Sequence, residues 1–125
     1  MTPETLLLRQ VHPNWIREGR ITSQVFRPTP KDKKQLSMYD GNQVTAREAH
    51  AHYTQQLELS SVGVMAVTVA ECQQQELPVV PDPVPFPAHV VIDFHAFSNA
   101  EIKTKAKHLT QAARLRGWQY HADVG

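Results

Sequence analysis

The run VGVMAVTVAE, residues 62–71, decides the fold class that the sequence predicts. Nearly all of its side chains are apolar, and most of them are β-branched or small. A strand that is apolar on both faces is typical of the centre of a sheet, where other elements cover both sides. We therefore expect a central β-strand here, and we expect the rest of the chain to surround it.

A second strand is expected over HVVIDFH, residues 89–95. Successive side chains of a strand point to opposite faces. One face is apolar and predicts a core, with Val90, Ile92 and Phe94. The other face is mostly polar, with His89, Val91, Asp93 and His95. This polar face is either plain surface or the floor of a functional site, and the sequence leaves both alternatives open.

Two capping boxes predict the main helices. In a capping box, a Ser or Thr side chain caps the first turn, and a Glu three residues later bonds back to the cap residue. Residues 45 and 48 (Thr and Glu) predict a helix over 46–57, and residues 98 and 101 (Ser and Glu) predict one over 99–116 that ends at Gly117. The second helix has an apolar stripe formed by Ile102, Ala106, Leu109 and Ala113.

Shorter segments complete the expected sheet. The further strands are expected at residues 4–11, 20–26, 35–42 and 77–80. The last of these is expected at a sheet edge, because Pro78 cannot donate to a strand ladder. A turn is expected at 72–75, and Trp118 and Tyr120 are expected in a final strand. The chain, residues 1–125, is therefore predicted to be one small α+β domain with a mixed or largely antiparallel sheet of about four to six strands and two main helices.

Charge is distributed unevenly along the chain, although the formal net charge is only +1. Residues 1–34 hold seven Lys or Arg and three acidic residues, residues 35–97 hold one and seven, and residues 98–125 hold five and two. Two basic ends around an acidic middle fit a polyanion, a self-complementary dimer or an acidic partner protein.

The sequence shows neither an export signal nor a membrane span, since its N-terminal region has only a three-leucine apolar run. A content of 41% hydrophobic and 20% charged residues is ordinary for a globular protein. The single cysteine, Cys72, excludes an internal disulfide. We therefore expect a cytoplasmic protein that does not enter a membrane.

The leading functional interpretation is a non-catalytic interaction module. It follows from the segregated charge and from a sequence without a glycine-rich phosphate loop, a serine-nucleophile elbow or a zincin motif. The expected partner is another protein or a second copy of this chain. No cofactor and no metal ion are expected. His50 and His52 point apart on a helix and cannot chelate one ion, and a metal site at Asp93 and His95 would need a further ligand from elsewhere in the fold.

The alternative interpretation is an enzyme that acts on a nucleotide or an RNA phosphate. The candidate catalytic residues are Arg9, Ser23, His89 and Asp93. This hypothesis requires all four to line one pocket, and a wider set of strand-borne candidates adds His12 and Ser37. The order Arg9, Ser23, Glu71 is similar to the Arg-Ser-Glu pattern of ADP-ribosyltransferases.

A third interpretation is a nucleic-acid-binding protein that uses its last helix. Lys103, Lys107 and Arg114 fall on one face of that helix, where they can reach successive phosphates.

The single cysteine, Cys72, is expected to be a structural thiol and not a nucleophile, because the neighbouring Glu71 raises the pKa of a thiol.

Several stretches together resemble a loosely defined group of small bacterial proteins that have no established activity. These stretches are LLLRQVHP (6–13), SQVF (23–26), LSMYD (36–40), LPVVPDPVPFPAHVVIDF (77–94) and the closing basic helix. The resemblance implies a bacterial, intracellular protein linked to a toxin–antitoxin or phage-defence locus. It assigns no role to any residue.

Overall fold

A six-stranded antiparallel sheet forms the centre of the computed structural model, which describes residues 1–29, 31 and 33–122. In spatial order its strands are β6 (Val79–Pro81), β7 (His89–Asp93), β4 (Gln35–Asp40), β1 (Leu6–Val11), β5 (Gly63–Thr68) and β8 (Tyr120–His121). A separate ribbon pairs β2 (Ile16–Arg17) with β3 (Arg20–Ile21). The predicted class, a single small α+β domain with a largely antiparallel sheet, is confirmed.

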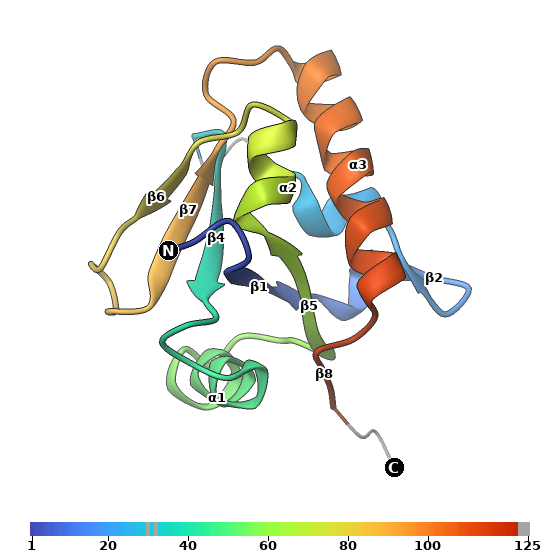
Figure 1. Cartoon of the computed structure of the whole chain (residues 1–125). Helices are drawn as coiled ribbons and strands as arrows, with labels where there is room; N and C mark the ends of the chain where they lie inside the picture. The colour runs from blue at the N-terminus through green and yellow to red at the C-terminus, as the bar shows by residue number, and fades with distance from the viewer. Residues whose placement is uncertain (30, 32, 123–125) are drawn as a thin grey trace.

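Helices lie on both sides of this sheet (Figure 1). The α-helices are α1 (Ala46–Ala51), α2 (Val69–Gln74) and α3 (Asn99–Arg116), and a π-helical turn, η4 (His52–Gln56), continues α1. Among the described residues, η1 (Pro13–Trp15) and η2 (Ser23–Phe26) are 3₁₀ turns. Helices α2 and α3 lie together on one side of the sheet, and α1 lies on the other, below β1 and β5 in the view.

The larger hydrophobic core lies between the sheet and the elements α2, α3 and η2. The predicted apolar side chains Val90, Ile92 and Phe94 are all buried in this core, but β7 ends at Asp93, two residues before the predicted end of the strand, so Phe94 follows it. The predicted stripe of α3 is confirmed as well, since Ile102, Ala106, Leu109 and Ala113 belong to the same core. All three capping boxes of the α-helices, one of which was not predicted, show both reciprocal hydrogen bonds.

A smaller core lies on the opposite face of the sheet, beneath α1. It contains Leu8, Tyr39, Ala49, Val64, Ala66 and Ala88. β8 closes this side by pairing with the start of β5. A Cβ on Gly63 would lie 2.6 Å from the carbonyl oxygen of Tyr120, so glycine is required for this close approach.

The predicted strand over 62–71 is wrong at its C-terminal end. β5 stops at Thr68, whose side chain accepts a hydrogen bond from the Glu71 N–H while the Glu71 carboxylate accepts one from the Thr68 N–H. This capping box starts α2, so the expected turn at 72–75 is helical through Gln74. The Thr-x-x-Glu signal was present in the sequence, but the apolar run outweighed it in the interpretation.

The predicted strand over 20–26 is also shorter than expected. Only Arg20 and Ile21 are extended, and η2 begins at Ser23. Val25 and Phe26 are adjacent and both fully buried, which a half-buried strand with alternating faces does not allow. The 3₁₀ turn places both side chains in the core against α3.

Candidate functional site

β1 and β4 separate after a short stretch of pairing, and a pocket lies where they part. Their described residues pair only at Leu7–Asp40 and Leu8–Tyr39, whereas β1 pairs with β5 along its whole length. Figure 1 shows the two strands running apart from the place where they meet. The carbonyl groups of β4 beyond this place therefore need partners other than the backbone of β1.

Arg9 bridges the separating elements. Its Nη1 donates to the carbonyl oxygen of Ser37 in β4 at 3.0 Å, and its Nε donates to the carbonyl oxygen of Val25 at 2.7 Å. Its guanidinium carbon also lies 5.1 Å from the ring centroid of Trp15, within the range of a cation–π contact. A single side chain thus connects β1, β4, η1 and η2 beside the pocket.

The pocket between β1 and β4, called here the β1–β4 pocket, has a volume of about 440 Å³. Its lining includes Arg9, Gln10, Trp15, Ser37, Phe86 and His89. These residues come from β1, η1, β4, β7 and the proline-rich connector before β7, and the segment after η4 completes the wall. A concave site of this size fits a small organic ligand.

Gln10 is the unusual member of this lining. The residue is only 4% exposed, and neither its amide oxygen nor its amide nitrogen has a hydrogen-bond partner among the described residues. A buried amide without partners costs free energy, so such groups are rare in folded proteins. Both polar atoms of this side chain are closed off from solvent, so a group that enters the pocket contacts them only after Gln10 or the side chains around it move.

His89 forms the centre of a hydrogen-bonded chain at the pocket. Its Nδ1 lies 2.9 Å from the carbonyl oxygen of Asp82 and 3.4 Å from a carboxylate oxygen of the same residue. Its Nε2 lies 3.1 Å from Oγ of Ser37. Because a carbonyl oxygen only accepts, Nδ1 carries a proton, and in the neutral ring Nε2 then accepts the hydroxyl proton of Ser37.

An aromatic group supports this histidine. Phe86 contacts the His89 ring edge-to-face, with centroids 5.1 Å apart, and stacks on Tyr39 at 4.9 Å. The hydroxyl group of Tyr39 lies 2.8 Å from Nδ1 of His52. Burial, and then the neighbouring Tyr53, raise the pKa of Tyr39 well above its usual value, so this hydroxyl group stays protonated.

The structure brings together two of the four predicted catalytic residues. Arg9 and His89 line the β1–β4 pocket, and so does Ser37 of the wider set. Ser23 begins η2 and Asp93 ends β7, and neither belongs to the lining. The condition that all four line one pocket is therefore not met.

Asp93 has a local role instead. Its carboxylate accepts the backbone N–H of His95 at 2.8 Å, so these two residues are linked through the backbone and not through the imidazole. The polar face that was predicted for residues 89–95 thus divides into two parts, and His95 lies beyond the end of β7. His89 and Val91 are buried, whereas His95 is exposed.

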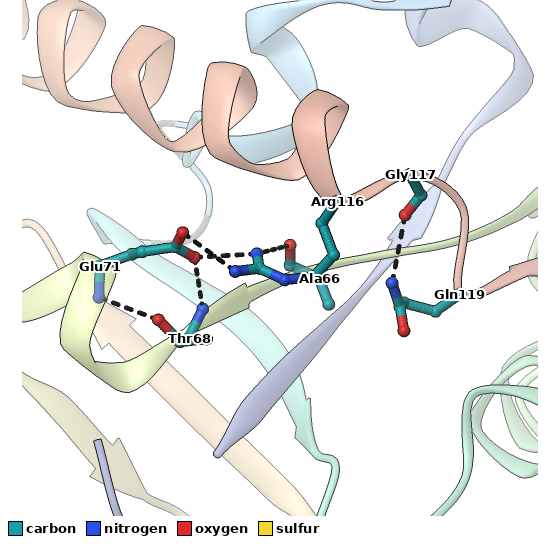
Figure 2. A network of polar contacts seen from close by, with 6 residues as sticks. All are labelled: Ala66, Thr68, Glu71, Arg116, Gly117 and Gln119. Atoms are coloured by element: carbon teal, nitrogen blue, oxygen red, sulfur yellow. Dashed lines mark hydrogen bonds and ion pairs between the residues drawn. The ribbon is translucent and has the colours of Figure 1, made fainter. Parts of the chain in front are cut away.

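Glu71 lies in a structural network and not in the pocket (Figure 2). Its two carboxylate oxygens lie 2.9 and 3.1 Å from the guanidinium nitrogens of Arg116, which also donates to the carbonyl oxygen of Ala66. Burial raises the pKa of Glu71, but the bonds and charge of Arg116 and the bonds of Thr68 outweigh this and lower it. The Arg-Ser-Glu resemblance therefore does not correspond to one site, because Glu71 joins α2 to the end of α3.

The three predicted nucleic-acid-binding residues differ in their surroundings. Lys103 and Lys107 are exposed on α3. Arg114 donates through Nε and Nη2 to the carbonyl oxygen of Ile21, so its guanidinium is engaged with the β2–β3 ribbon. Nucleic-acid binding by this face stays a prediction.

Gln10 and Asp82 were missed by reasoning from sequence. For Gln10 a signal existed, because it shares a strand face with Leu6 and Leu8 and is a polar residue at an expected core position. For Asp82 no signal existed, since its contact with His89 depends on the course of the proline-rich connector.

No protein-family model, curated protein or solved structure matches the chain. In the described part of the chain, no helix is long and apolar enough to cross a membrane. The described residues also contain no group of three His, Cys, Asp or Glu side chains placed to hold a metal ion. Bacterial origin, cytoplasmic location and the link to a toxin–antitoxin or phage-defence locus stay predictions.

We predict that Gln10→Met raises the free energy of unfolding by about 1 kcal/mol, because it replaces a buried amide without partners by an apolar side chain of similar length. Urea denaturation followed by circular dichroism measures the change. Gln24→Met, at an exposed position of η2, is the control and should change stability little. A loss of stability in Gln10→Met would mean that an ordered water molecule already satisfies the amide.

We also predict that Cys72 resists alkylation in the folded protein. Burial, and then the charge of Glu71, raise the pKa of this thiol to about 12, so the reactive thiolate is scarce at about pH 8.5, where a free thiol is half ionised. Mass spectrometry after iodoacetamide treatment should show an unmodified native protein and complete modification in guanidinium chloride. Equal modification rates in the two conditions would contradict this account.

Proposed function

We propose that the protein binds a small planar heterocycle, of the kind that a nucleotide carries as its base, in the β1–β4 pocket. The observation that supports this proposal most is the buried amide of Gln10, which has no partner in the described structure. A ligand that pairs with it removes the cost of leaving it unsatisfied. Ligand binding is thus favoured by the free energy that the unpaired amide costs the folded protein.

The chemistry of the amide selects the ligand class. A carboxamide presents one acceptor and one donor side by side. Its complement is a planar edge with an adjacent donor and acceptor, which the Watson–Crick edges of uracil and adenine provide. A simple hydrocarbon would fill the pocket but would leave the amide of Gln10 unpaired.

The rest of the lining supports the same class. Aromatic side chains of Trp15, Tyr39, Tyr53 and Phe86 contribute to the walls and offer surfaces for a flat ring. The described lining contains the guanidinium group of Arg9 and the imidazole ring of His89 but no carboxylate. It therefore suits a neutral or anionic ligand better than a cation.

The interaction-module interpretation depends on the distribution of charge along the sequence alone. No contact among the described residues adds to it. It stays a prediction, and a pocket for a small ligand is compatible with it.

We predict saturable binding of uridine 5′-monophosphate or adenosine 5′-monophosphate, observed through the fluorescence of Trp15. The chain has two tryptophans, and Trp118 lies outside this pocket, so the titration uses a Trp118→Phe background. In that background Gln10→Met should weaken binding about tenfold or more, which corresponds to the loss of buried hydrogen bonds.

The matched control is Gln24→Met in the same background, which should bind as the parent does because its side chain is exposed on η2. Two results would contradict the proposal. One is a fluorescence signal that neither nucleotide changes, and the other is equal affinity in the parent and in Gln10→Met.

A further inference from the structure

We infer that Ser37 is a nucleophile activated by His89, and that the β1–β4 pocket hydrolyses a carboxylic ester. This inference rests on the proposed function, because the ester would be carried by the heterocyclic ligand that the pocket binds. It assigns an activity to a chain of contacts that ligand binding alone does not require.

The geometry of a nucleophile, a base and an orienting group is present. Oγ of Ser37 lies within hydrogen-bond distance of Nε2 of His89, and Nδ1 of His89 is held by Asp82 on the other side of the ring. This order is the arrangement by which proteins raise the reactivity of a serine hydroxyl group. In the described structure, His89 is the only histidine whose two ring nitrogens both have hydrogen-bond partners.

The exposure of each of the three residues fits the role proposed for it. Ser37 is exposed to solvent, so a substrate can reach its hydroxyl group. His89 is only 8% exposed and is packed against Phe86, so its ring is fixed. Asp82 holds the Nδ1 tautomer chiefly through its backbone carbonyl, which is closer to the ring than its carboxylate is.

The reaction follows from these positions. Oγ of Ser37 attacks the ester carbonyl carbon while its proton passes to Nε2 of His89, and the carbonyl oxygen becomes an anion. Collapse breaks the bond to the alcohol, which leaves with the proton from His89. A water molecule, deprotonated by His89, then attacks the acyl-serine and releases the carboxylic acid, which restores Ser37 and the neutral ring.

Arg9 places a positive charge next to this centre. Its Nη1 is bonded to the backbone carbonyl oxygen of Ser37, the same residue that carries the nucleophile. A fixed positive charge at this position favours the anion that develops on the substrate oxygen. Arg9 can act in this way without giving up its hydrogen bonds to β4 and η2.

The test uses the full chain with two probes, p-nitrophenyl acetate and an alkyl fluorophosphonate. The wild type should release p-nitrophenolate and acquire one phosphonyl group, which tandem mass spectrometry localises to Ser37 within the tryptic peptide 35–47. Ser37→Ala should abolish both signals, and His89→Gln should lower the hydrolysis rate about 100-fold or more. Asp82→Asn should have a smaller effect, because its backbone carbonyl remains.

Ser60→Ala is the matched control, since Ser60 is exposed and lies outside the pocket. It should keep the wild-type rate and the wild-type labelling. Circular dichroism confirms that each variant folds. If His89→Gln does not fold, Ser37→Ala still tests the nucleophile and Asp82→Asn still tests the group that orients His89. A phosphonyl group on another residue, or hydrolysis that survives in Ser37→Ala, would overturn the inference.

Nucleotide binding to Ser37→Ala separates the two proposals. If this variant binds uridine 5′-monophosphate or adenosine 5′-monophosphate but the wild type shows neither hydrolysis nor labelling, the pocket binds ligands and Ser37 is not a nucleophile. If the wild type is labelled at Ser37 but binds neither nucleotide, the hydrolytic centre stands and the ligand class is wrong. If both fail, both proposals are wrong.

Discussion

The separation of β1 from β4 is the constraint on which the candidate site depends. If the two strands had stayed paired beyond Leu8 and Tyr39, their backbones would fill the space that the pocket occupies. Arg9 makes the separation possible, because its guanidinium donates to the carbonyl oxygens of Ser37 and Val25. The sheet therefore has two halves, and the pocket side chains project from the place where these halves part.

The two faces of the sheet are covered by different elements. On one side, α3 and α2 cover the larger core, and the Arg116–Glu71 ion pair ties the end of α3 to the start of α2 (Figure 2). On the other side, α1 and the smaller core cover β1 and β5. The pocket lies between the two cores, because Met38 of the larger core and Tyr39 of the smaller core both line it, and a buried polar group without partners there lowers stability. Gln10 carries such a group, because its buried amide has no hydrogen-bond partner among the described residues.

Local patterns predicted most of the fold. The capping boxes of α1 and α3, the alternation of β7 and the glycine after α3 each fix an element through neighbours in sequence, and each was recognisable. The start of α2 was missed because the apolar run before it outweighed its capping box. The turn η2 was missed because the residues of 20–26 alternate as in a strand, whereas the packing of Val25 and Phe26 into the core decides the conformation.

The candidate site was less predictable than the fold. Arg9, Ser37 and His89 were among the candidates because Arg, Ser and His on strands are suited to binding and proton transfer. Their convergence depends on where β1 and β4 part, which no short pattern encodes. Ser23 and Asp93 were chosen on the same chemical grounds, but the fold places them outside the pocket.

The central claim is that the amide of Gln10 becomes paired when a ligand occupies the pocket. The most direct measurement is the chemical shift of the Gln10 side-chain NH₂ group in ¹H–¹⁵N spectra during a titration with uridine 5′-monophosphate and, separately, adenosine 5′-monophosphate. The account predicts a saturable downfield shift of this amide with one of them, together with changes at Trp15 and His89. An amide signal that stays unchanged while other residues report binding would contradict the account.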